Sequence, residues 1–303
     1  CKYKVRPLGV FTETENKCSK HSMEEAHLKK YTSKKILIVG TGFLGAVLKT
    51  RLDPLGASVD STYYTHQKFS DSIQYDFFRD DVEKKFENKY DFIFLPTKLE
   101  FVEDGELLAE KLIHFLEYFT QSKVIYISSD GVFSGRKGLY KESDIPDPIT
   151  LYGKNLLICE KLVTVTCQRY AIVRPSYIYG YSLRQLDART EALLQEVREG
   201  KNVERLTDMY KSPLGVQQVA EAILKAGARE ENLLIHVAGE RLSVYEYSRD
   251  VLLALGQPID LLIPSTIPPG KEGEMLPDTS LDNGLMKKIL GIQPLSVEET
   301  FKE

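Results

Sequence analysis

Three glycines near residue 40 have the spacing of a phosphate-binding loop. They lie in the run Gly40-Thr41-Gly42-Phe43-Leu44-Gly45, directly after a short apolar stretch and at the start of a predicted helix. Gly40 permits a tight turn, Gly42 lets a pyrophosphate approach the backbone, and Gly45 allows close helix–strand packing. The helix N-terminus, at Phe43 and Leu44, supplies N–H donors and a positive dipole end. The run therefore predicts a dinucleotide site, with a merely structural glycine turn as the alternative.

The kind of dinucleotide depends on the end of the second predicted strand. Asp60 stands at the expected distance from Gly40 for a ribose-binding acid, but it falls inside this strand, which ends near Tyr63. A carboxylate at the strand end would bind the ribose and repel a 2′-phosphate. Because none stands there, the sequence slightly favours NADP over NAD. We expect Tyr63 to contact the cofactor, and Asp76 to contact its adenine unless it is simply an exposed loop acid.

Strands and helices alternate from residue 34 onward. Predicted strands cover residues 35–39, 57–63, 91–95, 123–128 and 167–174, and predicted helices cover residues 43–55, 105–120 and 151–163. This alternation produces right-handed βαβ units, so the predicted class is α/β, a Rossmann-type doubly wound parallel sheet.

The pattern loosens beyond Pro175, where a second unit is expected. Helices are predicted near residues 187–199, 216–225 and 244–255, a strand at 233–237, and a loop in the proline-rich stretch 258–277. We expect a dinucleotide-binding domain at 34–176, which residues 212–238 rejoin. Residues 177–211 and 239–303 would form a smaller C-terminal substrate-binding lobe. Residues 1–33 are polar and lysine-rich and are interpreted as an extension or linker, with an interaction segment as the alternative.

Three motifs in the middle of the chain resemble those of the extended short-chain dehydrogenase/reductases. They are Tyr126-Ile-Ser-Ser-Asp-Gly-Val-Phe133, Gly138-Leu-Tyr-Lys-Glu-Ser-Asp-Ile-Pro-Asp-Pro148 and Leu151-Tyr-Gly-Lys-Asn155. Their order is most similar to that of the dTDP-4-dehydrorhamnose reductase group, and the resemblance extends over about residues 34 to 300. It implies that NAD(P)H reduces a 4-keto-6-deoxy sugar linked to a nucleotide, which makes a nucleotide sugar the expected substrate.

The chemistry of such a reduction assigns roles to residues of these motifs. As a hydride reaches the keto carbon, a phenol delivers a proton to the forming alkoxide. Tyr152 is the candidate for that acid, and the Ser129 hydroxyl is the candidate for orienting the carbonyl. Asp130 joins them as a catalytic and substrate-binding candidate. The alternatives are a packed tyrosine and an ordinary serine at a strand end.

The resemblance also implies contacts to the cofactor and the sugar. The implied cofactor contacts, in addition to those above and to Tyr152, are Leu95, Pro96, Thr97, Arg174, Pro175 and Ser176. Tyr177 is an implied substrate contact. The alternatives are a structural turn around Pro175 and core packing for Tyr177.

Three positions depart from the family's pattern. The family places a lysine four residues after its tyrosine, where it shares a helix face with the phenol and lowers its pKa; here Leu156 stands in its place. Lys154, two residues after Tyr152, points about 200° around the helix and is no replacement. Gly131 replaces a tyrosine, and Leu276 replaces an arginine near the nucleotide.

These departures leave three functions open. The intact Tyr152, Ser129 and glycine loop favour a reductase. Leu156 and Leu276 favour a regulatory or scaffold subunit that binds the cofactor without catalysing. The beta regulatory subunit of methionine adenosyltransferase, a relative within the resembled family, is a precedent for this role. The third alternative is a sugar-nucleotide epimerase, which recycles its cofactor.

Composition narrows the remaining classes of partner. The chain has 303 residues and a net charge of −4, which argues against nucleic acid as a partner, and its apolar runs are far too short to span a membrane.

The four cysteines lack metal-binding spacing, so we expect no metal and a reducing, cytoplasmic location. A homodimer is one expectation, since dimers are common among relatives. Because residue 1 is Cys rather than Met, we expect a longer natural chain.

Overall fold

A seven-stranded parallel sheet forms the centre of the computed structural model, which describes residues 27–271 and 275–302. Its strand order is β13-β6-β5-β4-β1-β2-β3. The strands are β1 (Lys35–Ile38), β2 (Ser58–Tyr63), β3 (Ile73–Gln74), β4 (Phe92–Leu95), β5 (Lys123–Ile127), β6 (Arg169–Pro175) and β13 (Leu233–Val237). The strand order reverses between β1 and β4, which creates the switch point where such sheets bind ligands. The predicted Rossmann-type fold is confirmed.

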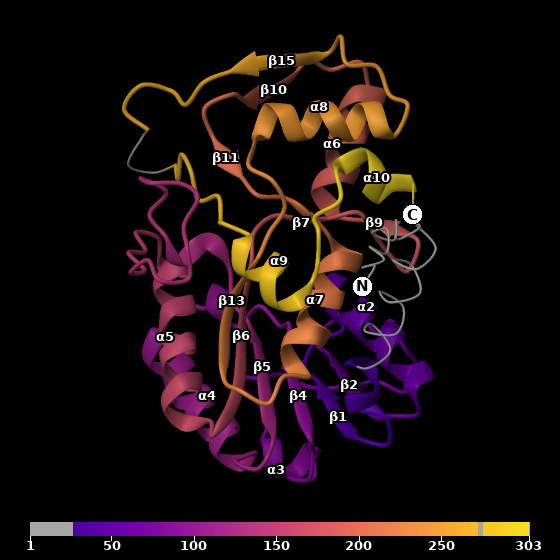
Figure 1. Cartoon of the computed structure of the whole chain (residues 1–303), viewed down its shortest axis with the longest axis vertical. Helices are drawn as coiled ribbons and strands as arrows, with labels where there is room; N and C mark the ends of the chain where they lie inside the picture. The colour runs from indigo at the N-terminus through magenta and orange to yellow at the C-terminus, as the bar shows by residue number, and fades with distance from the viewer. Residues whose placement is uncertain (1–26, 272–274, 303) are drawn as a thin grey trace, which may run out of the picture.

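Helices cover both faces of this sheet (Figure 1). On one face lie α2 (Phe43–Leu52), which runs on into the turn η2 (Asp53–Leu55), and α7 (Val216–Gly227). On the other lie α4 (Gly105–Tyr118) and α5 (Leu151–Thr166), with the short α3 (Val82–Lys85) against α4. The sheet is therefore buried on both faces, which explains why its strands are apolar runs rather than alternating ones.

Strand β1 shows how the sequence builds this core. Successive side chains of a strand point to opposite faces. Accordingly, Ile36 and Ile38 pack in the core beneath α2 and α7, whereas Leu37 and Val39 pack in the core beneath α4 and α5. Both hydrophobic clusters thus meet at the strand that leads into the glycine loop, and they hold it rigidly.

A smaller lobe lies at the carboxyl edge of the sheet, at the top of Figure 1. Its helices are α6 (Ala188–Arg198), α8 (Val244–Ala254) and α10 (Val297–Lys302), and β10 (Val203–Leu206) pairs in parallel with β15 (Leu262–Ser265). Three short pairs connect it to the rest: β7 (Ile178–Tyr179) with β12 (Leu214–Gly215), β8 (Tyr181–Ser182) with β9 (Gln185–Leu186), and β11 (Tyr210–Lys211) with β14 (Leu242–Ser243). The lobe has its own apolar core, which includes Tyr179, Leu193 and Val251.

Two predicted features of the C-terminal region are wrong. The proline-rich stretch 258–277 is not all loop, because it contains β15, whose Pro264 is accommodated in a two-stranded edge pair. Helix α9 (Gly284–Leu290) falls in the range predicted for the lobe, yet Met286 and Leu290 pack in the sheet core beneath α7. The chain therefore returns to the sheet domain a second time.

The interpretation of residues 1–33 as a linker is also too broad. Residues 1–26 lie outside the described part of the chain, but η1 (Lys29–Tyr31) packs on the sheet domain. Tyr31 is fully buried, its ring centroid lies 4.8 Å from that of Phe92, and its hydroxyl donates to the Leu224 carbonyl at 2.7 Å. The domain consequently begins before residue 34.

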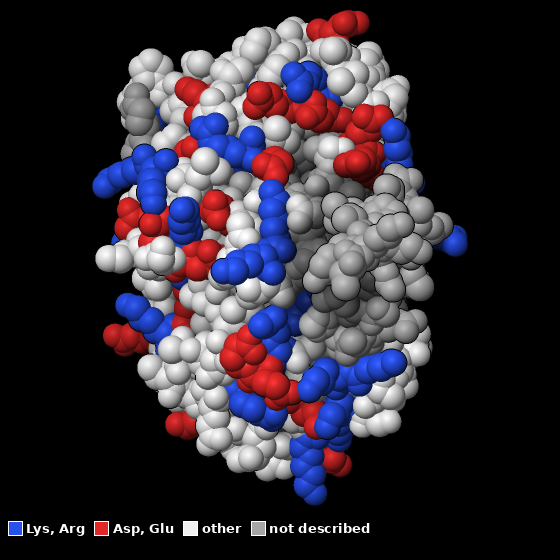
Figure 2. All heavy atoms as spheres, in the orientation of Figure 1, with Lys and Arg blue, Asp and Glu red and all other residues white. Residues whose placement is uncertain are grey.

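The surface carries both signs of charge. On the face shown in Figure 2, acidic and basic side chains are interspersed over the sheet domain and the lobe. Within residues 27–271 and 275–302, no helix has the length and apolar character needed to cross a membrane.

Candidate active site

The glycine loop has the backbone that its glycines allow. Gly40 has a φ of +98° and donates its N–H to Thr62 Oγ1 at 2.9 Å; a side chain would be strained at this φ. A Cβ on Gly42 would meet no atom within 4 Å, and no side chain of the described residues caps α2. The first turn of α2 therefore keeps free N–H donors with open space before them, as a bound phosphate requires.

The turn after β4 packs against this loop. A Cβ on Gly45 would lie 2.0 Å from the Gly40 carbonyl oxygen and 3.2 Å from Pro96 Cγ, and one on Gly40 would lie 3.1 Å from Thr97 Cβ. The structure thus brings Pro96 and Thr97 to the glycine loop, while Leu95 is fully buried at the end of β4. Of these three cofactor candidates, Pro96 and Thr97 are the ones placed beside the loop.

The end of β2 carries no acid at the ribose position. Asp60 lies within β2, where Tyr90 donates its hydroxyl proton to it at 2.5 Å, so it is a structural residue. Lys68, beyond Tyr63, donates from Nζ to the Gly42 carbonyl at 3.2 Å. Asp76 accepts from the Phe78 N–H at 3.0 Å in a local turn. A contact of Tyr63 or Asp76 with the cofactor stays a prediction.

Tyr152 and Ser129 are brought together from different elements. Tyr152 lies in the first turn of α5, which Thr150 caps by accepting from the Gly153 N–H at 3.0 Å. Ser129 follows β5 and precedes the short helix η4 (Asp130–Val132). Burial raises the pKa of the Tyr152 phenol, and a hydrogen bond with Ser129 opposes this shift. The two predicted residues are therefore neighbours.

Tyr152 packs against an aromatic ring and lies near two carboxylates. Its ring centroid lies 4.7 Å from that of Phe101, in the short helix η3 (Leu99–Phe101). After burial and the Ser129 hydrogen bond, the charges of Glu100 and Asp130 raise the pKa of Tyr152 further, while that of Arg189 lowers it. The phenol is accordingly a weaker acid than free tyrosine.

Leu156 does not support the phenol. It is 1% exposed in the core beneath α4 and α5. Lys154 and Lys161 are exposed, which agrees with the prediction that Lys154 is no replacement. Asn155 instead secures the neighbouring loop, because its Nδ2 donates to the Glu100 carbonyl at 3.0 Å and to that of Val102 at 2.8 Å.

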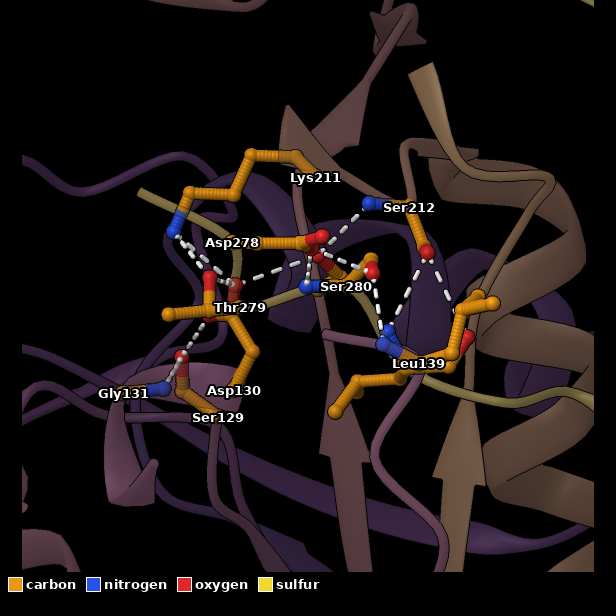
Figure 3. Close-up of polar contacts among 11 residues, drawn as sticks. Ser129, Asp130, Gly131, Leu139, Lys211, Ser212, Asp278, Thr279 and Ser280 are labelled. Carbon is orange, nitrogen blue, oxygen red and sulfur yellow. Dashed lines mark hydrogen bonds and ion pairs between the residues drawn. The ribbon is translucent and has the colours of Figure 1, made fainter. Parts of the chain in front are cut away.

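Asp130 accepts hydrogen bonds from four side chains, of which Figure 3 labels Ser129, Lys211 and Thr279. Its Oδ1 accepts from Ser129 Oγ at 2.9 Å. Its Oδ2 accepts from Lys211 Nζ at 3.0 Å, Thr279 Oγ1 at 2.6 Å and Ser176 Oγ at 3.2 Å. Burial would raise the pKa of Asp130, but the Lys211 charge and the hydrogen bonds outweigh it and lower that pKa. The carboxylate is ionised and fully engaged, which favours a positioning role over direct contact with substrate.

Arg174 forms a buried ion pair. Its side chain, 3% exposed, donates to Glu160 from Nε at 2.7 Å and from Nη2 at 2.6 Å, and Ser128 also donates to Glu160 at 2.5 Å. The guanidinium is thus held by Glu160, and a contact of Arg174 with the cofactor stays a prediction. Ser176, beyond Pro175 at the end of β6, is turned to Asp130 instead.

Tyr177 stands at the base of the lobe. The Arg189 guanidinium lies 4.4 Å from its ring centroid, and the Tyr247 ring packs at 4.9 Å. A contact of Tyr177 with the substrate stays a prediction. Arg189, exposed at the start of α6, is the cation whose charge reaches both Tyr177 and Tyr152.

Sequence reasoning missed Glu100, Lys211 and Thr279. Glu100 is 3% exposed, and burial raises its pKa to about 7 although Tyr126 donates a hydrogen bond to it. The sequence signal that could have pointed to Glu100 is its position as a charged residue within the apolar run Leu99 to Val102. Nothing local marks Lys211 or Thr279, which lie 81 and 149 residues from Asp130.

A doubly wound sheet, an open glycine loop and a serine–tyrosine pair together define the extended short-chain dehydrogenase/reductase class. Residues 116–295 match the family described as the RmlD substrate binding domain, and the chain belongs to that family.

Several known proteins are similar to this chain. Methionine adenosyltransferase 2 subunit beta of Danio rerio is 28% identical over 186 residues, which cover 59% of this chain and 57% of that protein. The chain thus spans little more than half the length of that relative. The solved structure of a hypothetical dTDP-4-dehydrorhamnose reductase from Sulfolobus tokodaii is 26% identical, with a TM-score of 0.73 over 87% of this chain and 98% of that one. The dTDP-4-dehydrorhamnose reductase of Bacillus anthracis in complex with NADP shares the fold at 20% identity, with a TM-score of 0.71 over 89% of this chain and 98% of that one.

Proposed function

We propose that this protein is an NADP(H)-dependent oxidoreductase that reduces the keto group of a nucleotide-linked 4-keto-6-deoxy sugar. The observation that carries the proposal is the pairing of Tyr152 with Ser129 at the same edge of the sheet as the open glycine loop. The membership of the RmlD substrate binding domain family supports it.

The residues of the loop fit a dinucleotide. The N–H groups at the start of α2 would hold the pyrophosphate, because Gly42 leaves space before them. Lys68 would favour a 2′-phosphate, since its ammonium lies at the loop and no acid follows β2 at residues 64–69. When bound, the cofactor would supply the hydride for the reduction.

The protein's own part in the reaction is to move a proton. Tyr152 Oη would give its proton to the carbonyl oxygen as the ketone becomes an alcohol, and the phenolate would then take a proton from water. Ser129 would position the carbonyl, and in this structure its Oγ is held in place by its hydrogen bond to Asp130. Because burial raises the pKa of Tyr152 and Leu156 offers no charge, we expect slow turnover.

A second candidate follows from the same two observations. With Leu156 buried and the phenol weakened as an acid, the site would bind NADP(H) without turning it over, in a regulatory or scaffold subunit. The similarity to a protein named as the beta subunit of methionine adenosyltransferase 2 favours this alternative.

Binding and turnover measured together separate the two candidates. NADPH and NADH are titrated by fluorescence, and oxidation of NADPH is followed by absorbance with dTDP-4-keto-6-deoxy-glucose and its UDP counterpart. We expect tight NADPH binding and slow oxidation that Tyr152→Phe abolishes. Tight binding with no oxidation above the Tyr152→Phe background would reject the reductase in favour of the second candidate.

The preference for NADP has its own test. Lys68→Gln should weaken NADPH binding about tenfold and leave NADH binding unchanged, because only NADPH carries the 2′-phosphate. The matched control is Lys154→Gln, an exposed lysine on α5. Equal weakening of both cofactors by Lys68→Gln would contradict the assignment of Lys68 to the 2′-phosphate.

A further inference from the structure

Lys211 extends from the C-terminal lobe into the loop that carries Ser129. It ends β11, and its ammonium hydrogen-bonds Asp130 at 3.0 Å and Thr279 at 2.5 Å (Figure 3). Its side chain is 20% exposed and that of Asp130 is 10% exposed. The ion pair is thus mostly withdrawn from water, where the loss of one partner leaves the other charge unsatisfied.

The Asp130 carboxylate accepts hydrogen bonds at both of its oxygens. A carboxylate accepts about four hydrogen bonds, and Asp130 accepts one from each of Ser129, Ser176, Lys211 and Thr279. It therefore acts as a fixed template rather than as a mobile acid or base, and Lys211 is the only cation among its donors in the described chain.

The template sets the direction of the Ser129 hydroxyl. Since Ser129 Oγ donates to Asp130, it is left to accept, and it does so from the Gly131 N–H at 3.2 Å. Gly131, which donates to Ser129 Oγ, packs on the Tyr152 ring, where a Cβ on Gly131 would lie 2.8 Å from Tyr152 Cε1. The segment that Lys211 and Asp130 hold in place therefore lies against the ring that carries the phenol.

Thr279, the second support of the template, is itself held firmly. The neighbouring Asp278 accepts from the Ser280 N–H at 3.1 Å and from its hydroxyl at 2.5 Å, and it pairs with Arg241 at 2.8 Å. Asp278 also packs directly on Gly138, where any Cβ would lie 2.1 Å from its Oδ2. The segment that carries Thr279 is therefore fixed, so Lys211 contacts a rigid surface.

We propose that Lys211 is a positioning residue for the proposed reduction: its ammonium fixes Asp130, which orients Ser129 against Tyr152. This role rests on the proposed function. The Lys211 ammonium also neutralises Asp130, one of the two carboxylates near the phenol; the other is Glu100. The charged groups that face this region are Glu100 from η3, Asp130 from η4, Arg189 from α6 and Lys211 from β11.

The test compares three variants of the full chain. Lys211→Met removes the charge and keeps most of the side-chain volume, and Lys211→Arg keeps the charge. Lys225→Met is the matched control, because Lys225 forms a similarly buried ion pair with Glu221 at 2.6 Å on α7, away from the site. The readouts are thermal unfolding, NADPH affinity, the pH profile of kcat, and the titration of Asp130 by ¹³C NMR with Asp130→Asn as the assignment standard.

We expect Lys211→Met to lower kcat about 10- to 100-fold with little change in NADPH affinity. It should move the Asp130 titration upward by about 1 to 3 pH units, since an opposite charge within 4–6 Å shifts a pKa by this amount. Lys211→Arg should restore most of both properties, and Lys225→Met should change only thermal stability.

A merely structural role predicts a different pattern. In that case Lys211→Met and Lys225→Met would both lower the unfolding temperature with kcat and its pH profile unchanged, even if the Asp130 titration moved, and the proposal would be overturned. If the wild-type protein shows no turnover, the proposed function fails, while the Asp130 titration still decides whether Lys211 fixes Asp130.

Discussion

The ring of Tyr152 packs directly on the backbone of Gly131. A Cβ on Gly131 would lie 2.8 Å from Tyr152 Cε1 and 3.3 Å from Leu156 Cδ1. The glycine that replaces the family's tyrosine therefore makes room for the phenol in its present position. Two departures from the family pattern, at residues 131 and 156, therefore lie next to one another beside Tyr152.

We expect Gly131→Ala to displace the Tyr152 ring. A contact under 3.0 Å must be relieved, so the phenol should move away from Ser129, and kcat should fall at least tenfold with an intact fold. Gly105→Ala is the matched control, because its Cβ would make only an ordinary 3.4 Å contact with Asn155. Equal activity of the two variants would show that the ring can shift at no cost.

Glu100 is expected to make the protein less stable as the pH rises. Burial raises its pKa to about 7 from 4.5, so the folded state retains a proton that the unfolded state releases above pH 4.5. Its stabilising contribution is complete below pH 4.5 and is lost as the pH rises through 7. Glu100→Gln, whose amide oxygen still accepts from Tyr126, should therefore unfold at higher urea concentration than wild type at pH 8, by up to about 3 kcal/mol.

His236 is expected to make the protein less stable as the pH falls. Burial and the charge of Arg174 lower its pKa to about 3 from 6.5, so the unfolded state binds a proton first as the pH falls. Its contribution is present above pH 6.5 and is lost toward pH 3, by about 2 kcal/mol between pH 7 and 5. Relative to the wild type, His236→Gln should therefore gain about 2 kcal/mol of stability from pH 7 to pH 5, because only the wild type loses the His236 contribution. Urea unfolding of both proteins at pH 7 and 5 measures this, and a parallel response of the two would refute it.

Arg189 rather than Lys98 is expected to tune the phenol. Arg189 lies on the face of Tyr177, and its charge opposes the raised pKa of Tyr152. Lys98 lies 5.7 Å from the Phe101 ring, and that ring packs on Tyr152. Arg189→Gln should lower kcat about three- to tenfold and shift its pH profile, whereas Lys98→Gln should not. A larger loss of kcat in Lys98→Gln than in Arg189→Gln would instead assign this role to Lys98, which directly precedes η3.

The sequence was sufficient for features that depend on neighbours in the chain. The apolar run of β1 and the glycines that follow it predict a strand, a turn and a helix start, because these depend on local backbone conformation. The pairing of Tyr152 with Ser129 was also predictable, since the carboxyl ends of parallel strands and the following helices meet at one edge of the sheet.

Arg174 and Tyr31 show where that reasoning ends. Their roles were predicted from position in a motif or from composition, whereas the structure shows both buried by partners from other elements: Glu160 for Arg174, and Leu224 and Phe92 for Tyr31. A side chain's direction depends on which surface the fold presents to it, and spacing alone does not contain that information.

By itself, then, the sequence determined the sheet, the dinucleotide loop, the serine and the tyrosine, and the loss of the lysine at residue 156. Only the tertiary structure decided how the site is charged, because Asp130 receives its cation from Lys211, 81 residues away, and its second support from Thr279, 149 residues away. Local propensity fixes elements along the chain, whereas a buried charge is stabilised by whichever donors the packed fold brings within hydrogen-bond distance.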